Sequence, residues 1–501
     1  MKRVIKYGFW CFALLLASCQ DFLEPKSQSE YVPKLVQSLQ ELLVGRVYMG
    51  PNDGAITGMM CFFDDDVACR SDLAGFDANS EGKFEQVRLA YSWSDEMPLR
   101  LSGYNVYGAI YQKIVGCNAV LDYMDDVDGS QEEKDYVTAQ ALTMRAFYYY
   151  YLVNMYGKPY NADKNAPGVP LKVTSNLSTG NISRSTVGEV YDQMVKDLLE
   201  SERLFKKLPA ADQYKREGLV NLPMIQLLLS RVYLYMENWQ EALNYGDKVI
   251  HDYNISLIDL AGGGKGKKGE GAVVFYSWDN PEVLFLFGDA YAANIFALTQ
   301  IAFLQGKGWE SKYVATVSDG LMDRYKDGDA RVDSYLRWDQ NWMNRLPVGK
   351  IEIDNGQIQS GKAWGGALRV SEAYLNVAEA AAMLYKTGGE ASYLTKAKDL
   401  MDDLREKRIN SYFYEELDIT DADDLITFIR EERRRELCFE SHRWFDLRRY
   451  GMDELTHVWY DAAGAKVEYK LEKNDPGFTL LIPQEAFELN HSLVQNEKRG
   501  K

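Results

Sequence analysis

The chain has 501 residues and a formal charge of −17, with 57 Lys and Arg residues against 74 Asp and Glu residues. This acidic balance argues against nucleic acid as a partner, because a face that binds nucleic acid must neutralise phosphates. Only four His residues are present, which leaves few ways to build a His-based metal site or acid–base pair. Aromatic residues make up 13% of the chain, and this richness is a first hint of function.

Residues 1–18 are typical of a secretory signal. Three basic residues precede an apolar stretch at 7–16, which is too short for the roughly 20 residues of a membrane-spanning helix. The segment Leu-Ala-Ser-Cys at 16–19 resembles a bacterial lipobox, in which the cysteine becomes lipidated after cleavage; plain secretion is the alternative. Because stable anchoring takes more than one acyl chain, we expect Cys19 to carry several and to anchor the protein.

Four cysteines follow the lipobox, and no two of them form a CxxC pair. A zinc ribbon or a redox motif is therefore not expected. An exported protein could oxidise Cys61 with Cys69 across a short loop, but we expect free, buried thiols at these positions and at Cys117 and Cys438.

Apolar periodicity predicts the helices. They cover about 102–123, 133–156, a segment capped by Ser185 that runs to about 207, 220–236, 239–251, 367–386, 391–407 and 422–450. The second helix contains four successive tyrosines, 148–151, which must face every direction and indicate burial on several sides. The pair 220–236 and 239–251 resembles a tetratricopeptide repeat, and such pairs stack because one pair cannot bury its own apolar face. We predict a mainly α fold, a tetratricopeptide-like helical superhelix of about four helix pairs.

The character of the chain changes between about 262 and 365. A Gly-rich linker is followed by strand-like runs at 273–278 and 283–287, and a turn-rich tail closes the chain. Half of the tryptophans fall in this stretch: Trp278, Trp309, Trp338, Trp342 and Trp364. An indole face offers apolar area with a polar handle, which suits stacking on the C–H face of a sugar ring. We predict an irregular, ligand-facing half with loops and short strands.

Several motifs have a structural explanation instead of a chemical one. Gly264, Gly266 and Gly269 match G-x-G-x-x-G, but a polar linker precedes them and a strand follows, so we expect a mobile loop. The acids at 64–66 and Asp327, Asp329 and Asp333 could offer oxygens to Ca²⁺, but solvated turns fit their spacing better. No cofactor or metal is predicted, although a structural Ca²⁺ is left open. Charge pairing explains the arginines at 433–435 and 448–449, with Glu431 and Arg435 as an i,i+4 pair.

Several segments together resemble the SusD/RagB family of outer-membrane nutrient-uptake lipoproteins. They are the lipobox with DFL at 21–23, TMRAFYYYYLVNMYGKP at 143–159, GVPL at 168–171, RSTVGEVYDQMVKDL at 184–198, NPEVLF at 280–285, DAR at 329–331, LRVSEAYLNVAEA at 368–380, REERRRELCFESHRWFDLRRYG at 430–451 and LLIPQEAFELNHSLVQN at 480–496. Their order covers nearly the whole chain. We expect the 430–451 block to be structural.

The resemblance implies a protein on the cell outer membrane, held by its lipid, that acts as a lid over a SusC-like TonB-dependent transporter. It implies capture of oligosaccharides or polysaccharides without catalysis; a peptide-binding, RagB-like member is the alternative. Ligand residues in this family lie in variable loops, so the candidates rest on position and chemistry: Trp93, Asp66, Tyr291, Trp309, Tyr313 and Trp338.

The predicted organisation has three parts. A signal peptide at 1–18 precedes an N-terminal region at 19–235 and a C-terminal region at 236–501, and the two regions form one compact unit. No G-x-S-x-G or H-E-x-x-H motif is present, so the protein is not expected to be an enzyme.

Overall fold

The structure, a computed structural model, describes residues 33–56, 58–72, 81–101, 105–176, 181–262, 275–290, 300–305, 308–339, 344–346, 350 and 364–500. In 300–305, 308–313, 337–339 and 344–346 it describes the backbone only. The predicted signal, Cys19 and the glycine loop at 264–269 lie outside the described residues.

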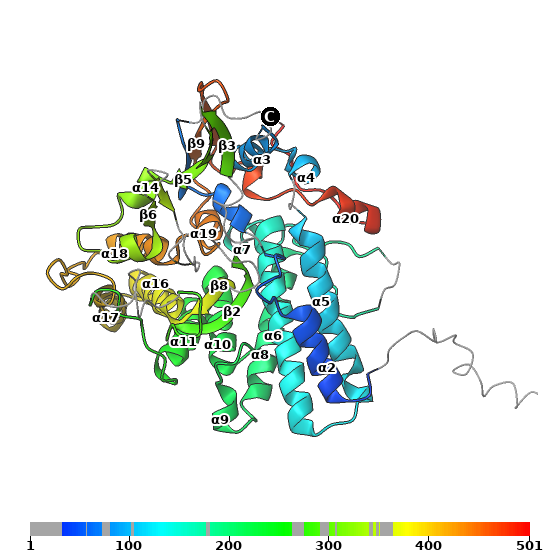
Figure 1. Cartoon of the computed structure of the whole chain (residues 1–501). Helices are drawn as coiled ribbons and strands as arrows, with labels where there is room; N and C mark the ends of the chain where they lie inside the picture. Colours follow the sequence, from blue (N-terminus) through cyan, green and yellow to red (C-terminus); the bar gives the residue numbers. More distant parts are fainter. Residues whose placement is uncertain are drawn as a thin grey trace, which may run out of the picture.

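Helices make up most of the described chain (Figure 1). The first half contains α2 (Val36–Leu42), η1 (Leu43–Val47), η2 (Gly58–Phe62), α3 (Glu81–Tyr91), α4 (Met97–Arg100), α5 (Val106–Tyr123), η4 (Met124–Asp126), α6 (Gln131–Tyr156), α7 (Tyr160–Asp163), α8 (Val187–Phe205), α9 (Ala210–Gln213), α10 (Leu222–Tyr235) and α11 (Trp239–His251). The second half contains α14 (Asp319–Met322), α15 (Arg331–Tyr335), α16 (Val370–Gly388), α17 (Ala391–Glu406), α18 (Ala422–Leu437), α19 (Arg443–Arg449), η5 (Pro476–Phe478) and α20 (Gln484–Leu489). None of the described helices combines the length and apolarity that a bilayer span requires.

Six of these helices form a row in which each packs against the next. α5 contacts α6, α6 contacts α8, α8 contacts α10, α10 contacts α11, and α11 contacts α16; two further helices, α17 and α18, both pack on α16. At the α11–α16 crossing, a Cβ on Gly246 would lie 2.4 Å from Cγ2 of Val377, so a small residue is required there. The mainly α fold with tetratricopeptide-like stacking is confirmed, since each pair buries its apolar face against its neighbour.

Hydrogen-bonded caps begin several of the long helices. Ser130 begins α6 with a capping box to Glu133, and Thr186 begins α8 with a capping box to Glu189. The predicted cap of α8, Ser185, was therefore wrong by one residue. Arg448 donates to the backbone oxygens of Asn154 and Gly157 at the end of α6, a favourable place for a cation.

The described strands form antiparallel pairs (Figure 1). The pairs are β1 (Val67–Cys69) with β5 (Ala315–Val317), β2 (Val283–Asp289) with β8 (Trp364–Arg369), β3 (Gln300–Gln305) with β4 (Gly308–Tyr313), β6 (Arg337–Asp339) with β7 (Asn344–Leu346), and β9 (Leu455–Tyr460) with β10 (Lys466–Leu471). The strand predicted at 283–287 is confirmed. Residues 275–278 of the run predicted at 273–278 form turns instead, and the predicted turn-rich tail contains the β9–β10 hairpin.

The helix predicted over 422–450 is interrupted. α18 ends at Leu437, and α19 begins only at Arg443, because Phe439 and Ser441 take φ angles of 59° and 63° in the left-handed region. The turn directs Glu440 inward, where it forms ion pairs of 2.6 Å with Lys350 and 2.5 Å with Arg369. Periodicity alone could not show this break, since both flanking segments have helical patterns.

The tyrosines at 148–151 are buried, as predicted. Tyr148 donates to the backbone oxygen of Val47, and Tyr149 donates to that of Lys172 at 2.8 Å. Tyr150 has no hydrogen-bond partner for its hydroxyl. The described cysteines are free, and Cys69 is the one that is half-buried.

Arginine and glutamate side chains from distant segments pair inside the C-terminal half. Arg331, Arg369 and Arg408 are fully buried and all form ion pairs with Glu436, at 3.3, 3.0 and 2.9 Å. Glu431 pairs with Arg324, and Arg435 pairs with Glu432, so the expected Glu431–Arg435 pair was wrong. The expected structural role of the 430–451 block is consistent with these contacts.

Candidate functional site

Two hairpins, β3–β4 and β6–β7, lie at one end of the molecule (Figure 1). The β1–β5 pair joins residues 67–69 to 315–317, β5 contacts β7, and β3 contacts α3. The β3–β4 and β6–β7 hairpins therefore lie near the same small sheet.

These hairpins carry three of the predicted ligand residues. Trp309 pairs with Leu304 and Tyr313 with Gln300 across β3–β4, and Trp338 pairs with Arg345 across β6–β7. Tyr291, the fourth aromatic candidate from this stretch, lies outside the described residues, as does Trp342. The fold thus brings the aromatic positions 309, 313 and 338 to one end, although 24 residues lie between 313 and 338 in the sequence.

The structure places Trp93 in the core, which corrects its prediction as a ligand contact. Its side chain is 1% exposed, and its indole N–H donates to the backbone oxygen of Phe63 at 2.9 Å. The ring stacks on the imidazole of His457 with centroids 4.0 Å apart. The face expected to meet a sugar is therefore covered by His457.

His457 lies between two aromatic rings, because Tyr91 stacks on its other side at 4.0 Å. Its Nδ1 lies 2.7 Å from the backbone oxygen of Tyr91 and its Nε2 lies 2.9 Å from that of Asp64. Burial lowers the pKa of His457 to about 4. The imidazole connects β9 to α3 and to the loop that precedes β1.

Asp64, Asp65 and Asp66 do not form the solvated turn that was expected. Asp66 is fully buried and pairs with Arg434 at 2.7 Å, and Asp65 accepts two bonds of 2.7 and 2.9 Å from Arg443. Burial raises the pKa of Asp64 well above its usual range, and the charge of Asp66 adds to this rise. Asp66 is thus a core residue, which corrects its prediction as a ligand contact.

The same three carboxylates lie close enough to share a cation, with oxygens within 4.8 Å of one another. The donor set does not suit Ca²⁺, because both oxygens of Asp65 and one oxygen of Asp66 already bond to guanidinium groups. Asp329, which was also expected in a solvated turn, is buried and pairs with Arg331 at 2.8 Å.

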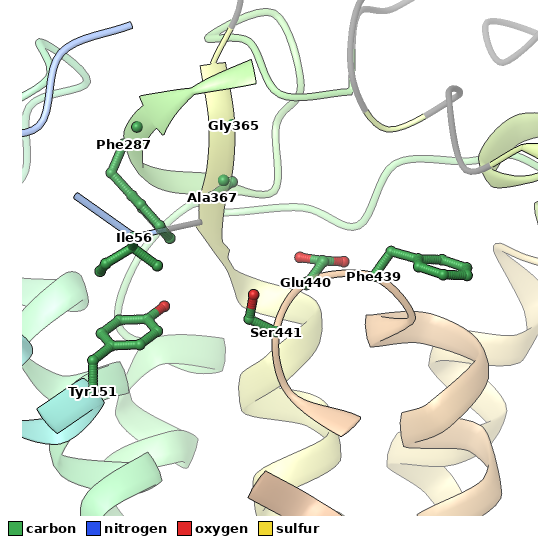
Figure 2. A pocket seen from close by; sticks show the side chains of 10 residues that line it. Ile56, Tyr151, Phe287, Gly365, Ala367, Phe439, Glu440 and Ser441 are labelled. Atoms are coloured by element: carbon green, nitrogen blue, oxygen red, sulfur yellow. The ribbon is translucent and has the colours of Figure 1, made fainter. Parts of the chain in front are cut away.

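A small pocket lies between β2, β8 and the turn that interrupts the C-terminal helices (Figure 2). Figure 2 shows the hydroxyls of Tyr151 and Ser441 and the carboxylate of Glu440 around it, while the Phe439 ring points away. Its volume is about 30 Å³, which suits one or two waters and falls far below the roughly 300–1,000 Å³ of ligand sites. This pocket is therefore too small for a sugar ring.

A larger cleft lies between the first half of α5 and α20. It measures about 600 Å³, and its lining residues are Asn105, Tyr107, Gly108, Tyr111, Gln112, Val115, Pro170, Lys172, Ile182, Glu485, Ala486, Leu489, Asn490 and Leu493. Aromatic and aliphatic side chains form most of the surface, with a few polar groups among them, which is typical of a binding site.

Sequence reasoning missed this cleft. The only signal was the pair Tyr107 and Tyr111 on one face of a predicted helix, and that pattern equally describes core packing. The opposite wall comes from residues more than 350 positions later, so only the folded chain joins them.

Comparison with known proteins gives consistent results for both halves. Residues 21–234 match a family described as "Starch-binding associating with outer membrane", and residues 298–498 match the "SusD family". The chain is 21% identical to SusD-like protein P25 of Formosa agariphila, over 90% of each chain. It is 25% identical to SusD-like protein P2 of the same organism, over 85% of this chain and 86% of that protein.

Solved structures share the fold. A SusD superfamily protein from Bacteroides thetaiotaomicron aligns with a TM-score of 0.68 and 22% identity, over 93% of this chain and all of that one. Surface glycan-binding protein A from the same organism, solved in complex with laminarihexaose, aligns with a TM-score of 0.62 and 20% identity, over 92% of this chain and 99% of that one.

Proposed function

Because the chain belongs to the SusD/RagB family, we propose that it is a cell-surface lipoprotein that captures an oligosaccharide or polysaccharide. It would deliver this glycan to a SusC-like TonB-dependent transporter in the outer membrane. The observation that carries the proposal is that both halves match the family, one of them to a profile described as starch-binding and associated with the outer membrane. The relative solved with laminarihexaose supports the same class of ligand.

The proposed glycan site is the end of the molecule where the hairpins carrying Trp309, Tyr313 and Trp338 converge. Tryptophan and tyrosine are residue types suited to stacking on the C–H face of a sugar ring. Hairpin ends also suit a variable ligand, since loops tolerate sequence change without loss of the helical scaffold. Tyr291 precedes the first of these hairpins in the sequence and remains a candidate.

The test is calorimetric binding of the chain from Gln20 onward to a panel of purified polysaccharides and oligosaccharides. We expect micromolar binding to one glycan class, and a loss of at least tenfold on Trp309→Ala, Tyr313→Ala or Trp338→Ala. Tyr412→Ala is the matched control, because Tyr412 is 86% exposed on a turn far along the chain. Unchanged glycan affinity in all three variants would place the site elsewhere.

The lipid anchor and the transporter need separate tests. Labelling cells with a palmitate analogue should mark the wild-type protein but not Cys19→Ala, which should leave the membrane fraction. Co-purification from outer membranes should recover a TonB-dependent barrel with the lipidated protein. A soluble, unlabelled wild-type protein would contradict the anchor without affecting the glycan proposal.

The alternative function is peptide capture at the same hairpins. A peptide would compete for the same aromatic positions, so the three substitutions would weaken peptide binding while the glycan panel stayed silent.

A further inference from the structure

We propose that the cleft between α5 and α20 is a second binding site, which takes a peptide segment that carries an apolar side chain next to a lysine or arginine. This site is independent of whichever ligand the hairpin end takes, because it uses different elements.

Several apolar side chains that line the cleft are open to solvent. Leu489 is 88% exposed, and the lining residues Val115 and Ile182 are half-buried. Lone exposed leucines are ordinary, but exposed apolar groups gathered around a concavity mark an interaction surface. An apolar side chain of a partner would cover these groups and fill the space between them.

The walls of the cleft are held in place before any ligand arrives. Tyr111 donates to the backbone oxygen of Pro170 at 2.7 Å, which fixes the chain around residue 170 to α5. On the other wall, the Asn490 amide donates to the backbone oxygen of Ile182 at 2.7 Å, which fixes the end of α20. Asn105 caps α5 through the N–H of Gly108 at 3.0 Å. A preformed cleft binds without ordering its own walls first.

The polar groups of the cleft point to the chemistry beside the apolar side chain. Among the described residues, the exposed Gln112 amide and Glu485 carboxylate form no hydrogen bond or ion pair, whereas Lys172 is engaged with the backbone oxygen of Asn176 at 2.6 Å. Gln112 can therefore bond a peptide backbone, and Glu485, with the exposed Glu488 nearby on α20, attracts a cation. The net charge of −17 also favours a basic partner.

A peptide fits this cleft better than a sugar. Val115, Ile182, Leu489 and Leu493 provide branched aliphatic surface, and the Tyr107 ring is buried instead of presenting an open face. Sugar rings need flat aromatic faces and many hydroxyl partners, whereas a leucine or phenylalanine side chain needs apolar contact on all sides.

The test uses saturation-transfer NMR with three blocked pentapeptides against the chain from Gln20 onward. Their sequences are Gly-Lys-Leu-Leu-Gly, Gly-Glu-Leu-Leu-Gly and Gly-Lys-Ser-Ser-Gly. We expect the first to bind, and the second and third to bind at least tenfold more weakly, because each lacks one of the two features.

Two substitutions at exposed positions connect this binding to the cleft. Leu489→Asp should weaken the first peptide at least tenfold, and Glu485→Lys should reverse the preference towards the Glu-containing peptide. The matched controls are Leu199→Asp on α8 and Glu416→Lys on a distant loop, which should leave the peptide affinity unchanged.

Each other outcome overturns the proposal. Absence of saturation transfer from all three peptides, or binding that survives both cleft substitutions, shows that the cleft is not a peptide site. Loss of glycan binding in Leu489→Asp would show instead that sugar occupies the cleft.

Discussion

The guanidinium of Arg434 on α18 bonds the carboxylate of Asp66 at 2.7 Å, and 367 residues lie between them in the sequence. Arg443 on α19 holds the neighbouring Asp65 in the same way. These contacts attach the loop before β1, and with it the β1–β5 pair, to the C-terminal helices. The Asp-rich turn therefore has a structural role, which is to hold this small sheet on the helical scaffold.

Replacing Arg434 should destabilise the protein strongly. Arg434→Ala leaves Asp66 buried without its partner, and breaking a buried ion pair costs about 3–5 kcal/mol. Urea denaturation should show this loss, whereas Arg203→Ala, which breaks an exposed pair with Glu200, should leave the free energy of unfolding nearly unchanged. A loss below about 1 kcal/mol in Arg434→Ala would contradict the supporting role of the pair.

Trp93→Ala separates a core role from a ligand role. Removing a fully buried indole that stacks on His457 should cost about 3–5 kcal/mol of unfolding free energy. Thermal unfolding should show a large fall in Tm, and glycan affinity measured well below that Tm should stay within about threefold of wild type. Normal stability combined with lost affinity would restore Trp93 as a contact residue.

The sequence was informative where local patterns decide the structure. The ends of α6 and α11, the burial of tyrosines 148–151 and the stacking of helices all follow from periodicity, caps and small residues at crossings. The prediction for the Asp-rich turn was wrong, because polar residues are expected to be exposed. The sequence does not show that arginines far along the chain pair with these carboxylates. Trp93 was misjudged for a related reason: its loop position suggested exposure, but His457 and Tyr91 enclose it.

The candidate sites depend even more on long-range packing. The residues 309, 313 and 338 could be grouped by composition, but only the strand pairings bring their hairpins to one end. The α5–α20 cleft left no recognisable pattern, since its two walls are joined only by the fold. The division of the chain at residue 235 and the lipidation of Cys19 stay predictions.

The helix crossing at Gly246 offers a direct test of the superhelical packing. Gly246→Ala places a methyl group 2.4 Å from Cγ2 of Val377 and 3.0 Å from Oγ of Ser230, so α11 and α16 must separate. Overpacking of this kind costs about 1–3 kcal/mol, which exceeds the roughly 1 kcal/mol that alanine gains in a helix. Denaturant unfolding should therefore show a net loss.

Gly388→Ala is the control for this substitution. Gly388 lies in the last turn of α16, where an added methyl group meets nothing within 4 Å. Alanine there should leave stability unchanged or raise it by up to about 1 kcal/mol. Equal effects of the two substitutions would mean that the α11–α16 crossing is looser than the structure indicates.

The pH dependence of stability should report the state of His457. Burial lowers its pKa from the usual 6.5 to about 4, so between these values the unfolded chain binds a proton that the folded chain does not. The titration of His457 therefore does not lower the free energy of unfolding above about pH 6.5. Below that pH it lowers the free energy of unfolding progressively, by about 2 kcal/mol at pH 5. His457→Gln cannot titrate, so its stability should fall less than that of wild type between pH 7 and pH 5.

Urea denaturation at each pH gives the change of unfolding free energy with pH for wild type and for His457→Gln. Comparing the two proteins cancels the contribution of His442, whose pKa is also lowered by burial. A wild type that gains stability relative to His457→Gln on acidification would contradict the neutral state. That result would mean that an imidazolium donates to both backbone oxygens, of Tyr91 and Asp64, with the carboxylates at 64–66 supplying the counter-charge. The sign of the difference between wild type and His457→Gln in the pH dependence of stability therefore decides whether His457 is neutral or charged where it connects β9 to α3 and to the loop before β1.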